Sequence, residues 1–414
     1  MRQYLNTCNL YILLWVLYSL QGTLYASGSI ISQGILAILL LWSIYYCFVV
    51  NTKYYSRELP SFIKAVNIFL IMATIYGIIL ILSGKELYIT EGEIIKTSNL
   101  DYLKNIYISL LPLYSFYEFS KRKLLTEEHI RVLIFILFIV AIMNFIENQE
   151  SKLMAALETG STREEFTLNA GYEFLHLIPL CLFWYKKPII QIVLVVTCAI
   201  FIVMCMKRGA ILIGAICILY FVFSAIRNMK GMQKFGIIAL VIIASIVVTG
   251  VVQNMIETSE YFSYRIEQTL EGDSSNRDVI YSKYWNHIKN EQSPLRFLFG
   301  NGANATLSIG PNYAHNDWLE IAINNGLIGV IIYIAYFISL IRDYIKSRKR
   351  LKYYYSNSLL MSTLILLSAS FFSMSYGSIG ISQTLAIGFV LAAINRDSYN
   401  NIRLHNEKVV IHEN

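Results

Sequence analysis

Long apolar stretches separated by short polar connections recur along the whole chain. Most of the stretches approach the roughly 20 residues that an α-helix needs to cross a bilayer. They are continuous rather than alternating in polarity, which excludes the pattern of an outer-membrane barrel. The pattern predicts an all-α, polytopic helical bundle of about twelve spans, two of them short (106–119 and 172–185). The spans lie near residues 10–26, 29–50, 62–83, 106–119, 130–146, 172–185, 189–206, 209–226, 235–252, 319–341, 357–374 and 379–394.

One connection is far longer than the rest and divides the chain into three parts. Residues 1–252 hold about nine spans, 253–318 form a large exported loop, and 319–414 hold about three spans and a tail. A connection of this length is usually functional. The first apolar stretch also resembles a signal peptide, but its length and the span that follows at once favour a retained helix.

Composition agrees with membrane insertion. The 414 residues are 56% hydrophobic and only 15% charged, whereas soluble domains carry about 25% charged residues. A soluble protein with a large core is thereby excluded. The six cysteines lie in or beside apolar stretches, without the spacing of a disulfide framework or a metal site, so we expect no metal and no cofactor.

Charge is distributed unequally between the two sets of connections. By the positive-inside rule the basic set faces the cytoplasm, which places both termini there and makes the basic clusters topology signals rather than a nucleic-acid site. The acidic or mixed set is 84–105, 147–171 and 253–318. The basic set contains Lys53, Arg57, Lys121, Arg122, Lys123, Lys186, Lys187, Arg227, Lys230, Lys234 and the basic residues of 342–352.

Lys207-Arg208 breaks this rule, because it lies between two spans on the face that is otherwise poor in basic residues. A pair at a helix end that extends its charges to the interface is one explanation. An anionic ligand on that face is the other.

The exported loop combines helical segments with a tight turn. Residues 260–270 and 278–290 are expected to be helical, and Tyr281, Tyr284, Trp285 and Ile288 follow helical spacing in the second segment. They are interpreted as an apolar face against the membrane or the bundle, with stacking on carbohydrate as the alternative. Gly300-Asn301-Gly302 then predicts a turn with positive φ angles.

His315 and Asn316 stand directly before the next span. Asn316 is a candidate cap of that helix, and Asp317 suits its N-terminal dipole. The functional alternative is a general base at the membrane surface, for which His315 has the pKa nearest neutrality. Asp317 is a candidate for orienting His315, and the sequence assigns no role to Glu320.

Arginines of the loop complete the candidate site. Arg265 and Arg277 are each explicable as solvated surface residues, but together with Arg208 they can form a cationic pocket facing outward. Guanidinium groups bind phosphate oxygens in bidentate fashion. One histidine beside several arginines at a membrane surface suits a lipid-linked pyrophosphate, whose leaving group the arginines would stabilise.

These residues carry a resemblance to the bacterial O-antigen polymerase and O-antigen ligase family. Lys207-Arg208-Gly209 opening a span resembles the family's Arg-Gly motif, and the loop arginines follow. The order Phe299-Gly300-Asn301-Gly302, His315-Asn316, Gly326-Leu327-Ile328-Gly329 completes the likeness. The segment that carries it is about 207–330.

The resemblance implies a GT-C-like, metal-free glycosyltransferase of the bacterial inner membrane. Its donor and acceptor would be undecaprenyl-diphosphate-linked glycans, and a chain-length regulator is a candidate partner. Arg208 with Arg277 or Arg265 would bind pyrophosphate, and His315 would activate the acceptor hydroxyl. Lys207, Asn316 and Asp317 are further candidates for substrate binding.

Three functions are considered for a protein with these features. A polymerase of repeat units is favoured, and a ligase that transfers glycan to lipid A core or another acceptor is the alternative. A flippase is the third, with Glu173 and His176 as its best candidate residues. Transporters more often show charge within their spans and internal repeats, and neither is evident here.

Overall fold

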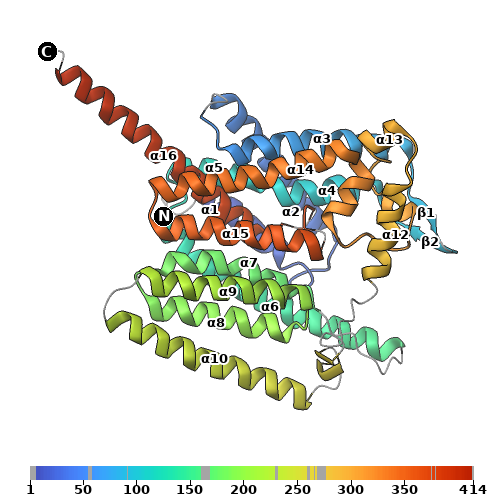
Figure 1. Ribbon diagram of the computed structural model, residues 1–414, viewed down its shortest axis with the longest axis horizontal. Helices are drawn as coiled ribbons and strands as arrows, with labels where there is room; N and C mark the ends of the chain where they lie inside the picture. The colour runs from blue at the N-terminus through green and yellow to red at the C-terminus, as the bar shows by residue number, and fades with distance from the viewer. Residues whose placement is uncertain are drawn as a thin grey trace.

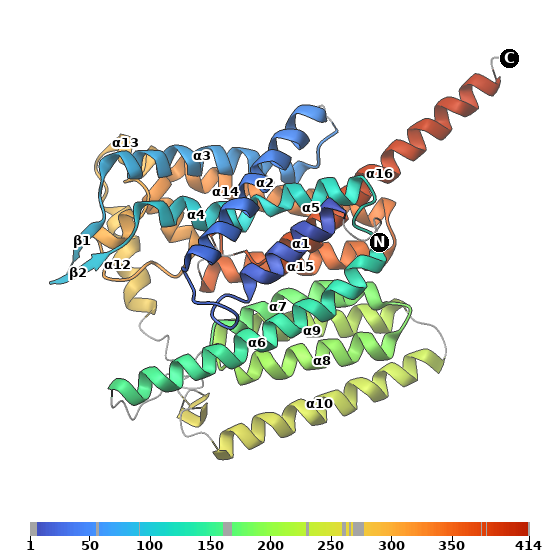
Figure 2. The same cartoon turned by 180° about the vertical axis from the view of Figure 1, so that it is seen from behind.

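The computed structural model is a bundle of long, roughly aligned helices (Figures 1 and 2). It describes residues 6–54, 58–90, 92–159, 168–228, 232–258, 262–264, 266–267, 277–373, 375–377 and 379–412. Apart from one small β-hairpin, the regular structure of these residues is helical. The prediction of an all-α, multi-pass helical membrane protein is therefore confirmed.

Every predicted span corresponds to a helix, and the helices before the long loop come first. They are α1 (Thr7–Ser19), α2 (Ile30–Lys53), α3 (Ser61–Ser83), α4 (Asn99–Leu110), α5 (Pro112–Lys121), α6 (Glu127–Thr159), α7 (Ala170–Cys181) with the short 3₁₀ turn η1 (Leu182–Trp184), α8 (Pro188–Met204), α9 (Arg208–Asn228) and α10 (Met232–Thr258).

The remaining elements belong to the long loop and the C-terminal part. They are α12 (Arg277–Lys289), α13 (Pro294–Phe299), the 3₁₀ turn η2 (Ala305–Ser308), α14 (Asp317–Arg350), α15 (Tyr353–Phe372) and α16 (Ile381–His412). The predicted loop helix at 278–290 is thus confirmed as α12. Most of the other predicted loop helix, 260–270, lies outside the described residues.

Not every predicted span is long enough to cross a bilayer as one straight helix. Within the described chain, seven helices are both long and apolar enough: α2, α3, α6, α9, α10, α14 and α15. Four further apolar helices are shorter. The predicted span 106–119 is divided between α4 and α5 at Pro112, since proline cannot donate the backbone hydrogen bond that a continuous helix needs.

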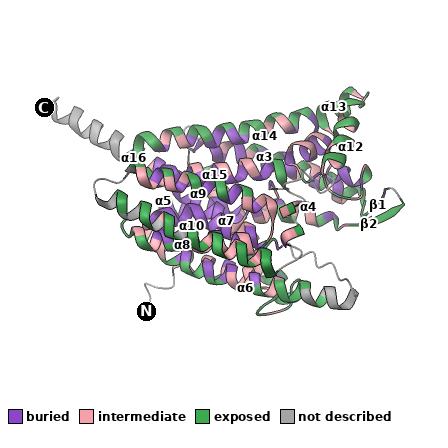
Figure 3. Cartoon of the chain, turned by 60° about the horizontal axis from the view of Figure 1, so that its bottom comes forward, coloured by how far each residue is buried: buried purple, intermediate pink, exposed green. Residues whose placement is uncertain are grey.

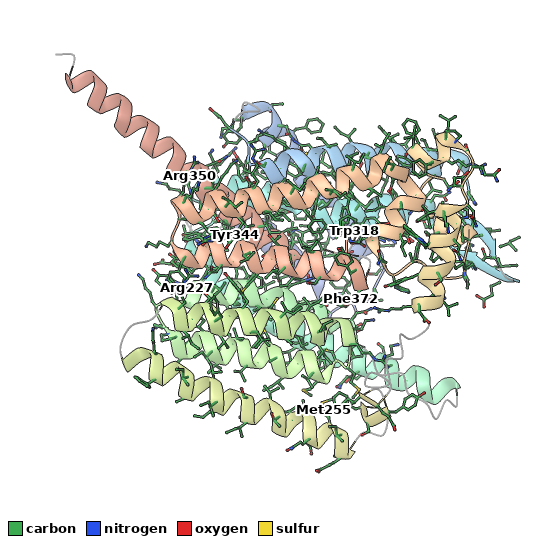
Figure 4. All side chains as sticks on the ribbon, in the orientation of Figure 1. Arg227, Met255, Trp318, Tyr344, Arg350 and Phe372 are labelled. Atoms are coloured by element: carbon green, nitrogen blue, oxygen red, sulfur yellow. The ribbon has the colours of Figure 1, made fainter. Side chains whose placement is uncertain are left out.

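The helices alternate in direction, so their ends gather at two opposite ends of the bundle. At the end that we call the basic end, α2, α5, η1, α9 and α14 terminate, and Figure 4 shows Arg227 and Arg350 there. The opposite end, called the loop end, carries the hairpin, α12 and α13. Lys207 and Arg208 lie at the loop end, because α8 ends and α9 begins there. Arg57 and Lys230 lie outside the described residues.

The loop end also contains a hairpin that the sequence analysis missed. Strand β1 (Leu87–Thr90) pairs antiparallel with β2 (Glu93–Lys96), with Leu87 opposite Lys96. The Thr90 hydroxyl donates to the Leu307 carbonyl oxygen at 2.7 Å, which ties the hairpin to η2. The available signal was a pair of short apolar runs, 87–89 and 94–95, on either side of the turn residue Gly92, but the pattern predicts only a connection between spans.

The core lies around α5 and α7. Residues Pro112–Ser120 of α5 are all buried, and so are ten of the twelve residues of α7. Figure 3 shows the buried positions gathered in the middle of the bundle and the exposed ones on its outer faces. Helix α7 is apolar on nearly all sides, as fully buried helices usually are, whereas α5 also buries Ser115, Glu118 and Ser120.

Helix α14 is bent where the loop docks on it. Gly326 has φ 66° and ψ −164°, so the helix is interrupted at this residue. Asn301 N–H donates to the Ile323 carbonyl oxygen at 2.8 Å, and Gly302 N–H donates to that of Asn324 at 3.0 Å. The predicted turn is confirmed, with φ 76° at Gly300 and 100° at Gly302. The turn's amides therefore satisfy carbonyl groups at the interruption of the helix.

Two glycines of this contact allow the effect of close packing to be separated from the effect of backbone strain. A Cβ on Gly326 would lie 2.5 Å from backbone atoms of Leu298 and Gly300, whereas a Cβ on Gly302 would meet nothing within 4 Å. Both positions have positive φ, which disfavours alanine by about 1–3 kcal/mol. We expect Gly326→Ala to lower the thermal unfolding midpoint of the purified protein clearly more than Gly302→Ala. Equal losses would show that backbone strain alone, without the close packing, determines the effect.

Candidate functional site

The predicted site residues that the structure describes lie at or just before the first turns of α9, α12 and α14. These turns meet the last turn of α15 at the loop end. Figure 4 places Trp318 of α14 near Phe372 of α15 at this end, far from Arg227 and Arg350. The Trp318 indole donates to the Ser370 hydroxyl at 3.0 Å, and its ring stacks on Phe371 at 5.7 Å between centroids. These contacts fix the start of α14 against the end of α15.

His315 is exposed and has a left-handed backbone conformation, with φ 50°. Such a conformation is uncommon outside glycine, although Asn, Asp and His adopt it more readily than other residues. Asn316 follows with extended backbone, and its Oδ1 accepts from Trp318 N–H at 3.0 Å and Leu319 N–H at 3.2 Å. The predicted cap is confirmed. The reversal of the chain at this cap leaves the imidazole at the surface.

Two buried carboxylates on the first turns of α14 hold the surrounding loops. Asp317 accepts from the Tyr333 hydroxyl at 2.6 Å and from both the backbone N–H and the hydroxyl of Ser375. Glu320 accepts from the Thr306 hydroxyl at 2.6 Å and from Ala314 N–H at 3.0 Å. Both side chains are fully buried, and these hydrogen bonds give their carboxyl oxygens partners within the fold.

This geometry bears on the predicted role of Asp317. Its two oxygens face Ser375 and Tyr333, so the contacts of the side chain are with α14 itself and the α15–α16 connection. A role for Asp317 in substrate binding or in orienting His315 stays a prediction, and its burial argues for a structural role. Glu320, which the sequence left without a role, joins residues 306 and 314 to α14.

Helix α12 lies beside His315 and the end of α15. The Tyr281 hydroxyl is 3.2 Å from the His315 carbonyl oxygen and 3.1 Å from the Phe371 carbonyl oxygen. The Asn316 amide donates to the same Phe371 oxygen at 3.3 Å. Burial raises the pKa of Tyr281, with Arg277 opposing the shift, so the phenol remains a hydrogen-bond donor at neutral pH.

The predicted apolar face of α12 is confirmed only in part. Tyr284 is fully buried and Tyr281 and Ile288 are half-buried, but Trp285 is 59% exposed. Trp285 therefore does not pack against the bundle, and its contact with the membrane or with carbohydrate stays a prediction. Its indole points away from the packed side of the helix because it follows Tyr284 by one residue, about 100° further around the axis.

Lys207 and Arg208 follow a second left-handed residue, Met206, which has φ 52°. Helix α8 ends at Met204, and the carbonyl oxygen of its cap residue Cys205 accepts from Leu168 N–H at 2.9 Å. Gly209 is enclosed, since a Cβ there would lie 2.6 Å from the Tyr172 hydroxyl and 3.8 Å from the Phe372 Cβ. The half-buried Arg208 thus begins α9 next to the last turn of α15.

The positive charges of two other predicted residues act on His315. The pKa of His315 is lowered, first by partial burial and then by the positive charges of Arg277 and Lys207. Partial burial and neighbouring cations both disfavour imidazolium. His315 is therefore neutral, and able to accept a proton, at a lower pH than an ordinary histidine.

The remaining predicted residue, Arg265, lies outside the described residues. Three groups of the site were not predicted: the Tyr281 hydroxyl, the Phe371 carbonyl oxygen and Ser375. Tyr281 was visible as a loop aromatic, whereas a backbone carbonyl leaves no signal in the sequence. In the part of the chain that the structure describes, no three His, Cys, Asp or Glu residues are grouped so that they could hold a metal ion.

The lowered pKa of His315 can be measured directly. In protein labelled at histidine, the imidazole resonance that His315→Ala removes should titrate below the ordinary value of about 6.5. Arg277→Gln should raise this pKa, because one of the two cations that disfavour imidazolium is lost. Lys289→Gln removes the same charge from the other end of α12 and should leave the titration unchanged. An ordinary His315 pKa in the wild-type protein and in both glutamine variants would contradict the electrostatic account.

The fold and this site define a multi-pass membrane protein with a histidine and a group of cations at one membrane surface. Residues 193–334 match the family model for O-antigen ligases, Wzy_C. The match spans about a third of the chain and contains every predicted site residue. It confirms the resemblance to the O-antigen ligase and polymerase family, whose members are membrane enzymes of polysaccharide biosynthesis. No curated protein gives a significant match to the chain.

Proposed function

We propose that this protein is a glycosyltransferase that polymerises undecaprenyl-diphosphate-linked repeat units into O-antigen or capsular polysaccharide. It would act at the periplasmic face of the bacterial inner membrane, with both termini in the cytoplasm. The loop end is then the periplasmic end. The distribution of charge supports this orientation, because helices with basic termini end together at the opposite side and basic termini favour the cytoplasm.

The observation that carries the proposal is the exposed His315 beside Arg277 and Lys207. Transfer of a glycan needs a base for the acceptor hydroxyl and positive charge for the diphosphate that leaves. A histidine whose pKa is lowered supplies the base near neutral pH. The cations are already in position before the reaction, so they can stabilise the negative charge that develops on the diphosphate in the transition state.

The proposed step uses these residues in the following way. The imidazole of His315 takes the proton of the acceptor hydroxyl as its oxygen forms a bond to the anomeric carbon of the donor. The bond from that carbon to the diphosphate oxygen breaks, and undecaprenyl diphosphate leaves with the electron pair. Arg208 and Arg277 would hold this diphosphate. Attack opposite the leaving group inverts the anomeric configuration.

The other predicted residues have supporting places in the proposal. Lys207 would add charge on the α9 side, and Arg265 is a further candidate for binding diphosphate. Asn316 is a candidate for substrate binding, although its side chain already caps α14 and contacts Phe371. Undecaprenyl-linked glycans would be both donor and acceptor, and a chain-length regulator would be a partner.

A ligase is the second candidate function. The family model that matches residues 193–334 is described as O-antigen ligase, and the proposed chemistry serves either acceptor. In a ligase the same residues would transfer finished glycan to lipid A core or another acceptor.

Transport remains a third prediction. Glu173 and His176 line a cavity of about 340 Å³ between α1, α4, α6 and α7. Asn144 donates to Glu173 at 2.9 Å. This contact gives the glutamate a partner within the fold.

The catalytic assignment is tested by three substitutions. His315→Ala and Arg208→Ala should abolish long glycan chains while the protein still inserts in the membrane. Arg208→Lys should also impair chain formation, because lysine cannot make the bidentate contact to phosphate. Arg342→Ala, an exposed arginine near the basic end of α14, is the control and should leave the chain-length ladder unchanged. Normal ladders in both alanine variants of the site would refute the assignment.

A deletion strain separates polymerase from ligase. If the protein is a polymerase, its loss leaves single repeat units on the final acceptor. If it is a ligase, long polymer accumulates on undecaprenyl diphosphate instead. A flippase would leave repeat units on the cytoplasmic leaflet. Electrophoresis of the mature polysaccharide together with extraction of lipid-linked glycans distinguishes the three outcomes.

A further inference from the structure

A second concentration of positive charge lies at the basic end, across the bundle from the proposed catalytic site. A cavity of about 640 Å³ opens there between the α5–α6 connection, the α14–α15 connection and α16. We call it the basic cavity. Five cationic side chains line it: Lys121, Lys123, Arg350, Lys352 and Arg396.

Negative charge in the lining does not balance these cations. Among the described residues of the lining, Glu127 supplies the one carboxylate. Glu127 already forms an ion pair with Arg131 and accepts from the hydroxyl groups of Tyr354 and Tyr355, at 2.9 and 3.2 Å. Since the Glu127 oxygens already have these partners, the single carboxylate does not neutralise the five cations of the lining.

Two acidic side chains, Glu58 and Glu118, lie close enough for their charges to act on Lys121, and Glu118 has other partners. Glu118 of α5 accepts from Lys53 at 3.1 Å and from Arg122 at 2.6 Å. The Lys121 amine instead lies over the ring of Tyr54, 4.5 Å from its centroid. Lys121 therefore contributes its charge to the cavity without an ion pair to this glutamate.

The backbone places two of the lysines at turns. Lys123 has a left-handed conformation, with φ 61°, immediately after the end of α5. Glycine is the usual residue at this position of a helix end, so lysine occupies it at some cost in backbone strain. Lys352 lies at the sharp turn between α14 and α15, where it is the N-cap residue of α15.

The positive-inside rule accounts for basic residues at this end, but it does not account for their convergence. Topology depends on how many basic residues flank each span. It sets no requirement that residues 121, 352 and 396 surround one cavity. Other basic residues of the same end, Lys186 and Arg227, are exposed and lie outside the lining.

The lining also has an apolar part that suits a lipid. Leu351 and Ala393 contribute apolar surface beside the rings of Tyr354 and Tyr355. The helices that border the cavity belong to the membrane bundle, so it opens at the level where phospholipid headgroups lie. Basic pockets between helices on the cytoplasmic side are a known means of binding anionic headgroups.

We propose that the basic cavity binds the phosphate of an anionic phospholipid headgroup from the leaflet at the basic end. Phosphatidylglycerol has the required single negative charge and a small polar headgroup. Its phosphate would lie among Lys123, Lys352 and Arg396, and its glycerol backbone against the tyrosines. Binding would join the α5–α6 connection, the α14–α15 connection and α16, and thereby stabilise the bundle. The proposal is independent of the reaction at the loop end.

The test compares lipids on the full-length protein purified in a non-ionic detergent. Phosphatidylglycerol should raise the thermal unfolding midpoint, whereas phosphatidylcholine should not. The variant Lys123→Gln/Lys352→Gln/Arg396→Gln should lose this rise and bind phosphatidylglycerol about tenfold more weakly or worse, since each cation contributes to attraction of an anionic headgroup. Sodium phosphate, matched in ionic strength with sodium chloride, tests free phosphate as the ligand.

A matched control removes the same number of charges from the same end. Lys186→Gln/Lys187→Gln/Arg227→Gln should keep the response to phosphatidylglycerol. Equal loss in both triple variants, or no response of the wild-type protein to phosphatidylglycerol, would overturn the proposal. A full response to sodium phosphate alone would overturn the lipid assignment. If the triple variant does not fold, the single variant Lys352→Gln takes its place and should bind phosphatidylglycerol more weakly than the wild-type protein. The wild-type protein should also lose its binding of phosphatidylglycerol at high salt, because salt screens the attraction between charges.

Discussion

The close backbone contact between the loop and the kink of α14 determines how the loop end is built. Gly300 and Gly326 approach so closely that neither has room for a Cβ, and the amides of Asn301 and Gly302 bond to carbonyl groups of α14. This contact positions the start of α14, from which Asp317 and Glu320 hold the neighbouring loops. The position of His315 follows from these attachments, since it precedes the capped end of the same helix.

The fold could be predicted largely from hydropathy, because a membrane span must be continuously apolar over a known length. Alternation of basic connections also gave the correct grouping of helix ends. The kink at Gly326 and the break at Pro112 were not predicted, although both residues were visible. Glycine and proline permit interruptions, but whether a helix is interrupted depends on tertiary partners such as Gly300. The hairpin at 87–96 was missed because Thr90 finds its partner at Leu307, 217 residues further along the chain.

The sequence predicted those parts of the candidate site where a residue departs from a regular pattern or stands at a distinctive position. Lys207-Arg208 was found because it broke a charge rule, and His315 because it stood at a helix start in a long loop. The structure brings His315 together with Arg277 and Lys207. Sequence could not show that Asp317 faces Ser375 rather than His315, since adjacent residues point in different directions. It also could not show the role of the Phe371 carbonyl oxygen, because every residue has one.

The contacts of α14 at both of its ends restrict how the chain can change in length. At the loop end Asp317 and Glu320 make the attachments described above. Near the basic end the buried Asp343 accepts from Phe62 N–H at 2.8 Å, at the start of α3. Inserting one residue between them would turn one end relative to the other by about 100° and shift it by about 1.5 Å. Both sets of contacts could not then be kept, so an insertion or deletion within α14 should not be tolerated.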